Sequence, residues 1–398
     1  MIRELRKSFN QQFSEEKYTA FLDDLHSYYP GAIDFRVAET PVFVSQWVKE
    51  KMISTSESII DFICSHDFKS ITQYSIPLHQ TIPRENKHPQ FLVFDYGICT
   101  NEKGELYPAL IEMQGFPTLY GLQVFYPEVL EKHFSIPERF SHYLNGYEKQ
   151  DYINLLTKSI VGNYASEEVI LLEIRPHNQK TRIDFYCTQT YTGIQPVCIT
   201  ELYAKGNQLF YNRNGKEQII KRIYNRIIWD ELNAVRSALG TIVDLNNDYD
   251  VEWAPHPHWF YRISKYTMPF LSGECIPETR FLDQFLPLPE DLSSFVLKPL
   301  FSFAGQGVII DPTPSDIDRI TDKKNWILQK KVNYADCIET PDGPAKVEIR
   351  LMYLWPDDAD RPILVNNLAR LSKGKMIGVR YNKDKTWVGG SVAYFEKD

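Results

Sequence analysis

The sequence is poor in cysteine, and its cysteines are not arranged as metal ligands or as a disulfide framework. The six cysteines are widely scattered, none forms a CxxC pair, and none has a histidine at a zinc-ligand spacing. Such spacing favours free thiols in a reducing compartment over a set of cross-links. We therefore expect a cytoplasmic protein whose fold does not depend on disulfides or on structural zinc.

Long apolar runs and an excess of positive charge are also lacking. No stretch approaches the roughly 18 uncharged apolar residues of a membrane span, and the first residues do not have the apolar segment of a signal peptide. The formal net charge is −8, which argues against a broad basic surface for nucleic acid. We expect neither a membrane nor a nucleic-acid partner, and the sequence does not indicate the oligomeric state.

What is present is an ordinary globular balance of 43% hydrophobic and 24% charged residues, in a chain of 398 residues that is long enough for several lobes. The periodicities predict an α+β protein. A mostly helical region is expected first, with a break at the polar run Ser54–Ser56. The expected order is a helical region at 1–88, a strand–turn–strand segment at 89–160, an α/β lobe at 161–285 and a strand-rich segment with a glycine loop at 286–398.

A lysine at the end of an apolar strand is the first candidate for a binding site. Lys298 follows Phe295–Leu297, and Ser302, Gly305 and Gly307 come shortly afterwards. An unpaired ammonium inside a protein costs several kcal/mol, and glycines let backbone N–H groups approach an anion closely. The pattern suits a nucleotide polyphosphate, although it is not a P-loop. The alternative is an exposed lysine before an ordinary hairpin loop.

A predicted hairpin carries the second candidate, a set of oxygen ligands. Glu112 and Gln114 alternate by two, so both side chains emerge on one face of a strand. If Asp95 lies on the antiparallel neighbour, the three residues converge in the way that a nucleotide-bound Mg²⁺ prefers. The alternative is a solvated, acidic hairpin face.

Two further segments carry weaker signals. The strand Trp326–Val332 leads into a short connection whose main-chain groups can meet an adenine edge, although any strand end looks similar. Farther along, arginines on two predicted strands and in the stretch that follows them can hold phosphate or carboxylate through paired hydrogen bonds. The alternative there is a charged antiparallel edge. These arginines are Arg350, Arg370 and Arg380.

Taken together, the segments resemble the ATP-grasp superfamily. FDYG, NEKGEL, IEMQ and GFPTL resemble its metal-binding hairpin, VLKPLFSFAGQGV its lysine–glycine element, and LQKKV its adenine hinge. Ser264–Tyr266 and Cys275–Thr279 resemble the stretches that precede that element. The hairpin lies ahead of the lysine–glycine element, an order that resembles the circularly permuted branch containing glutathionylspermidine synthase. Residues 173–185 and 222–232 resemble the inserted Rossmann-like lobe of that branch.

The resemblance implies a ligase that uses ATP and Mg²⁺. A carboxylate of a small molecule or peptide would attack the γ-phosphate of ATP to give an acyl phosphate and ADP, and an amine or thiol would then displace phosphate from the acyl group. The implied metal ligands are Asp95, Glu112 and Gln114. The implied nucleotide-binding residues are Lys265, Lys298, Ser302, Gly305, Gly307, Gln329, Lys330 and Val332. Arg350, Arg370 and Arg380 are implied at the γ-phosphate and the acyl intermediate, with Arg370 and Arg380 ranked first.

Two positions depart from the family pattern. Gln114 stands where asparagine is usual, and Val93 where relatives often carry arginine. An alternative interpretation is therefore a nucleotide-binding regulatory or scaffold protein whose ligase chemistry has decayed. A hydrolase using Cys64 and His66 is disfavoured, because Cys64 lies in a helical pattern typical of packing. The aromatic stretch Trp253–Tyr261 is also better explained by packing than by a substrate platform.

Overall fold

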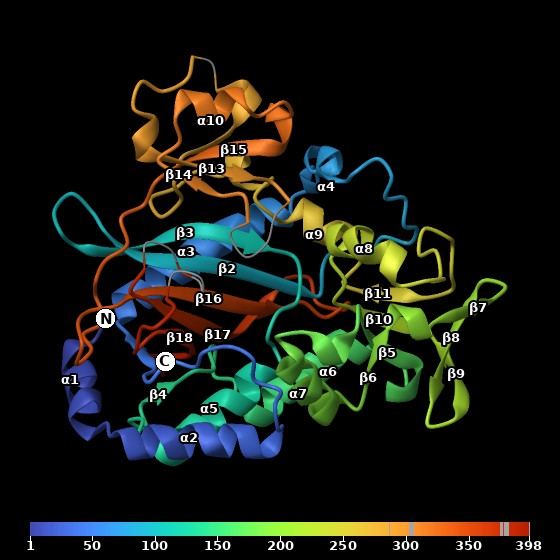
Figure 1. Cartoon of the computed structure of the whole chain (residues 1–398), viewed down its shortest axis with the longest axis horizontal. Coiled ribbons are helices and arrows are strands. Elements are labelled where there is room, and N and C mark those ends of the chain that lie inside the picture. Colours follow the sequence, from blue (N-terminus) through green and yellow to red (C-terminus); the bar gives the residue numbers. More distant parts are fainter. Residues whose placement is uncertain (286, 302–305, 375–376, 378–381, 398) are drawn as a thin grey trace.

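A five-stranded antiparallel sheet forms the centre of the protein (Figure 1). The computed structural model describes the chain except residues 286, 302–305, 375–376, 378–381 and 398. In spatial order the strands are β18 (Gly389–Ser391), β17 (Ile363–Ser372), β16 (Lys346–Leu354), β2 (Phe91–Thr100) and β3 (Leu106–Gln114). The predicted hairpin is confirmed as β2 and β3, and its first strand pairs with β16 from the far end of the chain. Two distant segments therefore form one continuous surface.

The two faces of this sheet are covered differently. Because side chains alternate along a strand, Leu92, Phe94 and Tyr96 share one face, which packs against α3 (Gln46–Ile63). The opposite face is apolar at the end that carries Phe91 and Val93, where side chains of α5 (Leu122–His133) and α6 (Lys149–Val161) cover it. The rest of that face carries charged side chains.

Helix α3 is continuous, so the predicted break at Ser54–Ser56 is wrong. The hydroxyl of Ser56 is buried and lies 2.8 Å from the hydroxyl of Tyr96, while Ser54 donates back to the carbonyl of Lys51. Ser56 thus has a partner outside the helix, so its hydroxyl does not compete with the helical hydrogen bonds. Packing against the sheet decides the outcome over the local polar pattern.

The N-terminal segment is mainly helical and meets the C-terminal end of the chain. Ser14 begins helix α2 by accepting a hydrogen bond from the Lys17 amide. A separate three-stranded sheet joins β1 to β19 in parallel and β19 to β4. The helices of the N-terminal segment, besides α3, are α1 (Arg3–Gln12), α2 (Glu15–Tyr28) and α4 (Phe68–Ile71). The strands of the three-stranded sheet are β1 (Val42–Val44), β19 (Ala393–Glu396) and β4 (Phe140–Ser141).

A four-stranded parallel sheet forms a second lobe, with a three-stranded ribbon projecting from it at the right of Figure 1. Strand β5 is apolar and fully buried, as expected of a strand in a parallel sheet. The sheet order is β11 (Glu252–Ala254), β10 (Arg222–Asn225), β5 (Val169–Glu173) and β6 (Gln195–Cys198). The ribbon consists of β7 (Tyr203–Lys205), β8 (Gln208–Arg213) and β9 (Lys216–Ile220). The same part of the chain contains the helices α7 (Arg182–Thr192) and α8 (Trp229–Val235).

A small antiparallel sheet forms a third lobe, at the top of Figure 1 beyond strand β3. It has its own core, which includes Phe295, Leu297 and Leu328. Its strands, in spatial order, are β12 (Thr279–Phe281), β15 (Trp326–Lys330), β13 (Phe295–Pro299) and β14 (Ile309–Ile310), with helix α10 (Pro314–Asp318) beside them. A short helix, α9 (His258–Arg262), precedes this lobe in the chain.

The architecture is thus mixed α+β with several sheets, as the sequence predicts. None of the helices in the described part of the chain combines the length and apolar character that crossing a membrane requires.

Candidate functional site

Lys298 lies where the third lobe meets the central sheet. It comes near the end of β13, and only 9% of the residue is exposed. Its ammonium donates to Gln329 Oε1 at 2.5 Å and to the carbonyl oxygen of Ile111 at 3.4 Å. Because Ile111 directly precedes Glu112, the lysine lies beside the predicted metal hairpin. The alternative of an exposed lysine before a surface loop is therefore wrong.

A second buried lysine lies near the first. The pKa of Lys298 is lowered to about 8, mainly by burial and also by the charge of Lys265, while Glu112 and Glu348 oppose the shift. Burial also lowers the pKa of Lys265, against the charge of Glu112. Two ammonium groups with depressed pKa values in one place favour the binding of an anion, which would stabilise both charges.

The charged half of the central sheet is arranged by strand register. Asp95 on β2 lies opposite Glu112 on β3 and opposite Arg350 on β16, so the three form one row across the sheet. In the next row, Glu348 on β16 lies opposite Arg370 on β17. Directly opposed side chains on one face lie within contact range. Oppositely charged residues from four strands are therefore brought together.

Asp95 lies at the bottom of this cluster. Arg350 donates through Nε to Oδ1 and through Nη2 to Oδ2, both at 2.6 Å, and Arg370 donates to Oδ2 at 2.9 Å. Burial alone would raise the pKa of Asp95, but the two guanidinium groups outweigh burial and lower it. Asp95 is consequently a buried carboxylate whose charge is balanced by arginines.

Glu112 and Gln114 are more accessible. The Glu112 side chain is 26% exposed, against 1% for Asp95, and Gln114 is half-buried. The Gln114 amide donates to Glu112 Oε1 at 3.1 Å, so the two side chains share one face as predicted. A carboxylate and an amide oxygen at an accessible position fit the few protein ligands that a nucleotide-bound Mg²⁺ takes.

No sequence pattern indicated that Tyr334 and Gly97 belong to this cluster. The hydroxyl of Tyr334 donates to Glu348 at 2.9 Å, and a Cβ on Gly97 would lie only 2.6 Å from the Tyr334 ring. The ring therefore rests on the sheet at the point where β2 has no side chain. A glycine inside a strand can mark such a close approach, but it does not name the residue that approaches.

The predicted adenine hinge is partly engaged within the protein. The backbone N–H groups of Lys330 and Lys331 donate to the carbonyls of Glu278 at 2.7 Å and Ser294 at 2.8 Å. Val332, which follows β15, is half-buried. The side chain of Gln329 accepts a hydrogen bond from Lys298 and donates one to the Thr279 hydroxyl at 3.1 Å. Gln329 therefore fixes the position of the Lys298 ammonium.

The glycine loop and one arginine fall largely outside the described residues. Ser302, Gly305 and Arg380 are among the residues whose structure is not described. Gly307 is described, and its φ of 75° lies in the left-handed region that favours glycine. The predicted roles of all four remain predictions.

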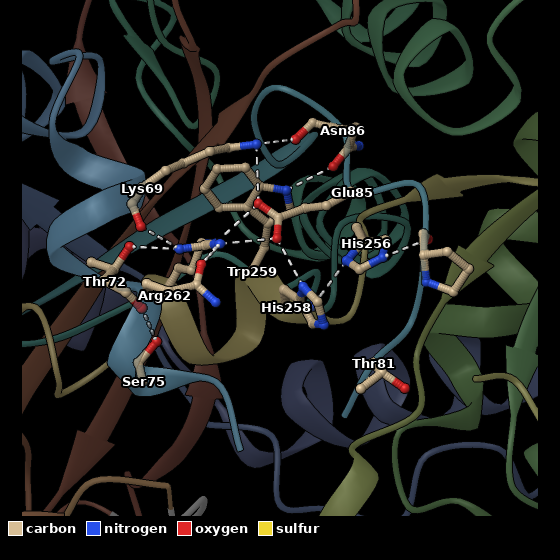
Figure 2. A network of polar contacts seen from close by, with 12 residues as sticks. Lys69, Thr72, Ser75, Thr81, Glu85, Asn86, His256, His258, Trp259 and Arg262 are labelled. Carbon is tan, nitrogen blue, oxygen red and sulfur yellow. Dashed lines mark hydrogen bonds and ion pairs between the residues drawn. The ribbon is translucent and has the colours of Figure 1, made fainter. Parts of the chain in front are cut away.

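A second ion network joins the N-terminal segment to helix α9 (Figure 2). Arg262 donates to both oxygens of Glu85 at 3.0 Å, Lys69 lies 3.0 Å from Oε1, and His258 Nδ1 lies 2.8 Å from Oε2. Burial opposes the charge of Glu85, but His258 and Arg262 lower its pKa. The partner of His258 thus comes from a segment that is distant in sequence, which sequence spacing could not show.

Glu85, His256 and His258 place possible metal-ligand atoms within 4.8 Å of one another. Their donor set does not fit a metal well. Both ring nitrogens of His256 are already engaged, since Nδ1 accepts the His258 amide at 3.2 Å and Nε2 lies 3.1 Å from the carbonyl of Pro83. Lys69 and Arg262 already neutralise Glu85, so a divalent cation would meet strong repulsion. The network is explained as an internal ion pair.

The structure also argues against the hydrolase. Cys64 is exposed just after α3, and partial desolvation together with the nearby carboxylates of Asp61 and Glu57 raises the pKa of its thiol, which leaves little reactive thiolate. His66 is fully exposed and lies 3.1 Å from Asp67. The aromatic residues Trp253, Trp259 and Tyr261 are buried, in agreement with a packing role.

Comparisons with known proteins inform the fold. No family model matches the sequence, and no curated protein is detectably similar to it. The structure is similar to that of a glutathione synthetase-like effector from Globodera pallida, determined in its apo form, with a TM-score of 0.53. The chain shares the overall fold of this effector. The match covers 91% of this chain and 90% of the other at 9% identity, so it concerns the fold alone, which is compatible with an ATP-grasp-like architecture.

Proposed function

We propose that this protein is an ATP-dependent ligase of the circularly permuted ATP-grasp type. It would join the carboxylate of a small molecule or peptide to an amine or thiol through an acyl phosphate. One observation carries the proposal. Lys298 on one lobe lies beside the Glu112–Gln114 strand of another, inside a glutathione synthetase-like fold. Neither feature alone would indicate a triphosphate site.

The charge of the residue cluster around Lys298 and Glu112 supports this function. Its described part brings together four cations and three carboxylates, which leaves one net positive charge: Lys265, Lys298, Arg350, Arg370, Asp95, Glu112 and Glu348. Phosphoryl transfer depends mainly on positioning and on neutralising the oxygens of the transferring group. A cation-rich cluster suits an anionic nucleotide, and Mg²⁺ held by Glu112 and Gln114 would supply further neutralisation.

The chain's own residues would divide the remaining tasks. Lys298, oriented by Gln329, would bind the α- and β-phosphates, and Lys265 would add a second positive charge. Arg370 has a side chain that is 35% exposed and is the most accessible described arginine of the cluster. We assign it to the γ-phosphate and the acyl phosphate. Arg350 is largely buried against Asp95, so its effect on the nucleotide would be electrostatic.

Calorimetric titration with Mg·ATP tests the proposal. Lys298→Ala and Glu112→Ala should each weaken binding about 10- to 100-fold, the loss expected for one charge-assisted contact, and should abolish turnover. Lys149→Ala is a matched control, since Lys149 is exposed on α6 and pairs only with Glu128. Unchanged ATP affinity in both variants of the cluster would remove the assignment.

One observation favours a second candidate, a nucleotide-binding regulatory protein. Val93, where family members often carry arginine, is fully buried in the apolar half of the sheet, so it offers no charge to a phosphate. The similar structure is itself that of an effector. Release of ADP and phosphate in the presence of candidate acids and amines would identify a ligase, and nucleotide binding without turnover would favour the regulatory protein.

A further inference from the structure

Asp95 differs from Glu112, although both were predicted as metal ligands and lie opposite each other in the sheet. Glu112 is 26% exposed, whereas Asp95 is 1% exposed and lies between Glu112 and Arg350. Accessibility decides which of the two carboxylates can meet a hydrated cation. Mg²⁺ loses its waters reluctantly and keeps several of them when it binds beside a nucleotide.

The oxygens of Asp95 are also already engaged. A carboxylate has roughly four acceptor positions, and three of those on Asp95 receive guanidinium N–H groups at 2.6, 2.6 and 2.9 Å. A metal on Asp95 would displace Arg350 or lie against it. Arg350 is itself buried, and separating a buried ion pair leaves an uncompensated charge.

Arg370 is the residue that this arrangement controls. One of its nitrogens, Nη2, donates both to Asp95 and to Glu348, and Glu348 in turn accepts from the Tyr334 hydroxyl at 2.9 Å. The two carboxylates therefore hold the guanidinium from two sides, while 35% of the Arg370 side chain remains exposed. Holding a long side chain in one geometry before the ligand arrives lowers the entropic cost of binding.

We infer that Asp95 is a positioning residue that holds Arg350 and Arg370, and that Glu112 and Gln114 provide the metal ligands of the site without Asp95. This inference rests on the proposed function and changes one part of it. Asp95 acts on the nucleotide through Arg370, and the dependence of nucleotide binding on Mg²⁺ comes from the β3 strand.

The first experiment measures calorimetrically how much Mg²⁺ strengthens the binding of a non-hydrolysable ATP analogue, relative to EDTA. In Glu112→Gln the strengthening should fall at least tenfold. In Asp95→Asn it should stay within about twofold of the wild-type value, as in the control Asp358→Asn, whose residue is exposed and pairs with Lys158. A fall in Asp95→Asn equal to that in Glu112→Gln would overturn the inference.

The second experiment tests the action through Arg370 by comparing the affinities for the ATP analogue and for ADP. Asp95→Asn and Arg370→Gln should each reduce the preference for the triphosphate, and the double variant should lose no more than Arg370→Gln alone. A purely structural defect would weaken both nucleotides alike. Fully additive losses in the double variant would also overturn the inference.

Further outcomes distinguish a folding defect of Asp95→Asn from a failure of the proposed function and from a failure of the inference alone. If Asp95→Asn does not fold, Asp95→Asn combined with Arg350→Gln removes both buried charges and should retain the full Mg²⁺ strengthening. If the wild-type protein does not bind the analogue, the proposed function and the inference fail together. If the wild type and Glu112→Gln behave as expected while both Asp95 variants lose the Mg²⁺ effect, the inference alone fails.

Discussion

Two buried ion networks in this protein differ in what their charges require. In the network around Glu85, cations converge on one carboxylate and lower its pKa, so the charged state is stabilised by the protein itself. In the cluster around Lys298 and Glu112, burial lowers the pKa of Lys298 to about 8, so the charged state is destabilised until an anion arrives. The charges of the first network are neutralised within the protein, so its role is structural. The second network contains a lysine with a shifted pKa, which is typical of binding sites.

The largest effect is expected from breaking the satisfied network. Glu85→Ala should destabilise the protein by about 3 kcal/mol, because Arg262 and His258 would lose the carboxylate between them in a largely buried place. Chemical denaturation gives the free energy of unfolding. The control Asp358→Ala removes an exposed pair and should cost less than about 0.5 kcal/mol. Equal effects of the two substitutions would show that the Glu85 network is not structural.

The opposite sign is expected in the cluster around Lys298 and Glu112. Lys298→Met should leave the free energy of unfolding unchanged or raise it by about 1–2 kcal/mol, because a buried ammonium with a depressed pKa opposes folding at neutral pH. The same variant should lose nucleotide binding. A stability loss as large as that of Glu85→Ala would contradict the distinction between the two networks.

The smallest effect concerns pH. The free protein holds a proton on Lys298 below about pH 8, and nucleotide binding needs that proton. Affinity should therefore be nearly constant below pH 8 and fall up to tenfold per pH unit above it, which is about 1.4 kcal/mol per unit. Calorimetry in buffers of different ionisation enthalpy should show proton uptake on binding above pH 8. Proton release at that pH would be inconsistent with a lysine that is deprotonated in the free protein.

Local patterns predicted the parts of the site well where they concern neighbouring residues. The alternation of Glu112 and Gln114 and the hairpin that places Asp95 opposite Glu112 follow from strand geometry. For Lys298 the sequence left a buried and an exposed position open, and the structure shows that it is buried. The predicted break in α3 failed because a buried tyrosine hydroxyl supplied a partner for Ser56, which the helical pattern could not show.

The amino-acid sequence by itself determined that Phe91–Gln114 forms a hairpin and that Glu112 and Gln114 share one face of its second strand, because these depend on period and composition over a few residues. Only the tertiary structure decided that β16 lies beside β2, that Arg350 faces Asp95, and that Glu85 meets Arg262. Pairing between distant strands is set by packing of the whole chain. This pairing places two arginines, Arg350 and Arg370, on the carboxylate of Asp95.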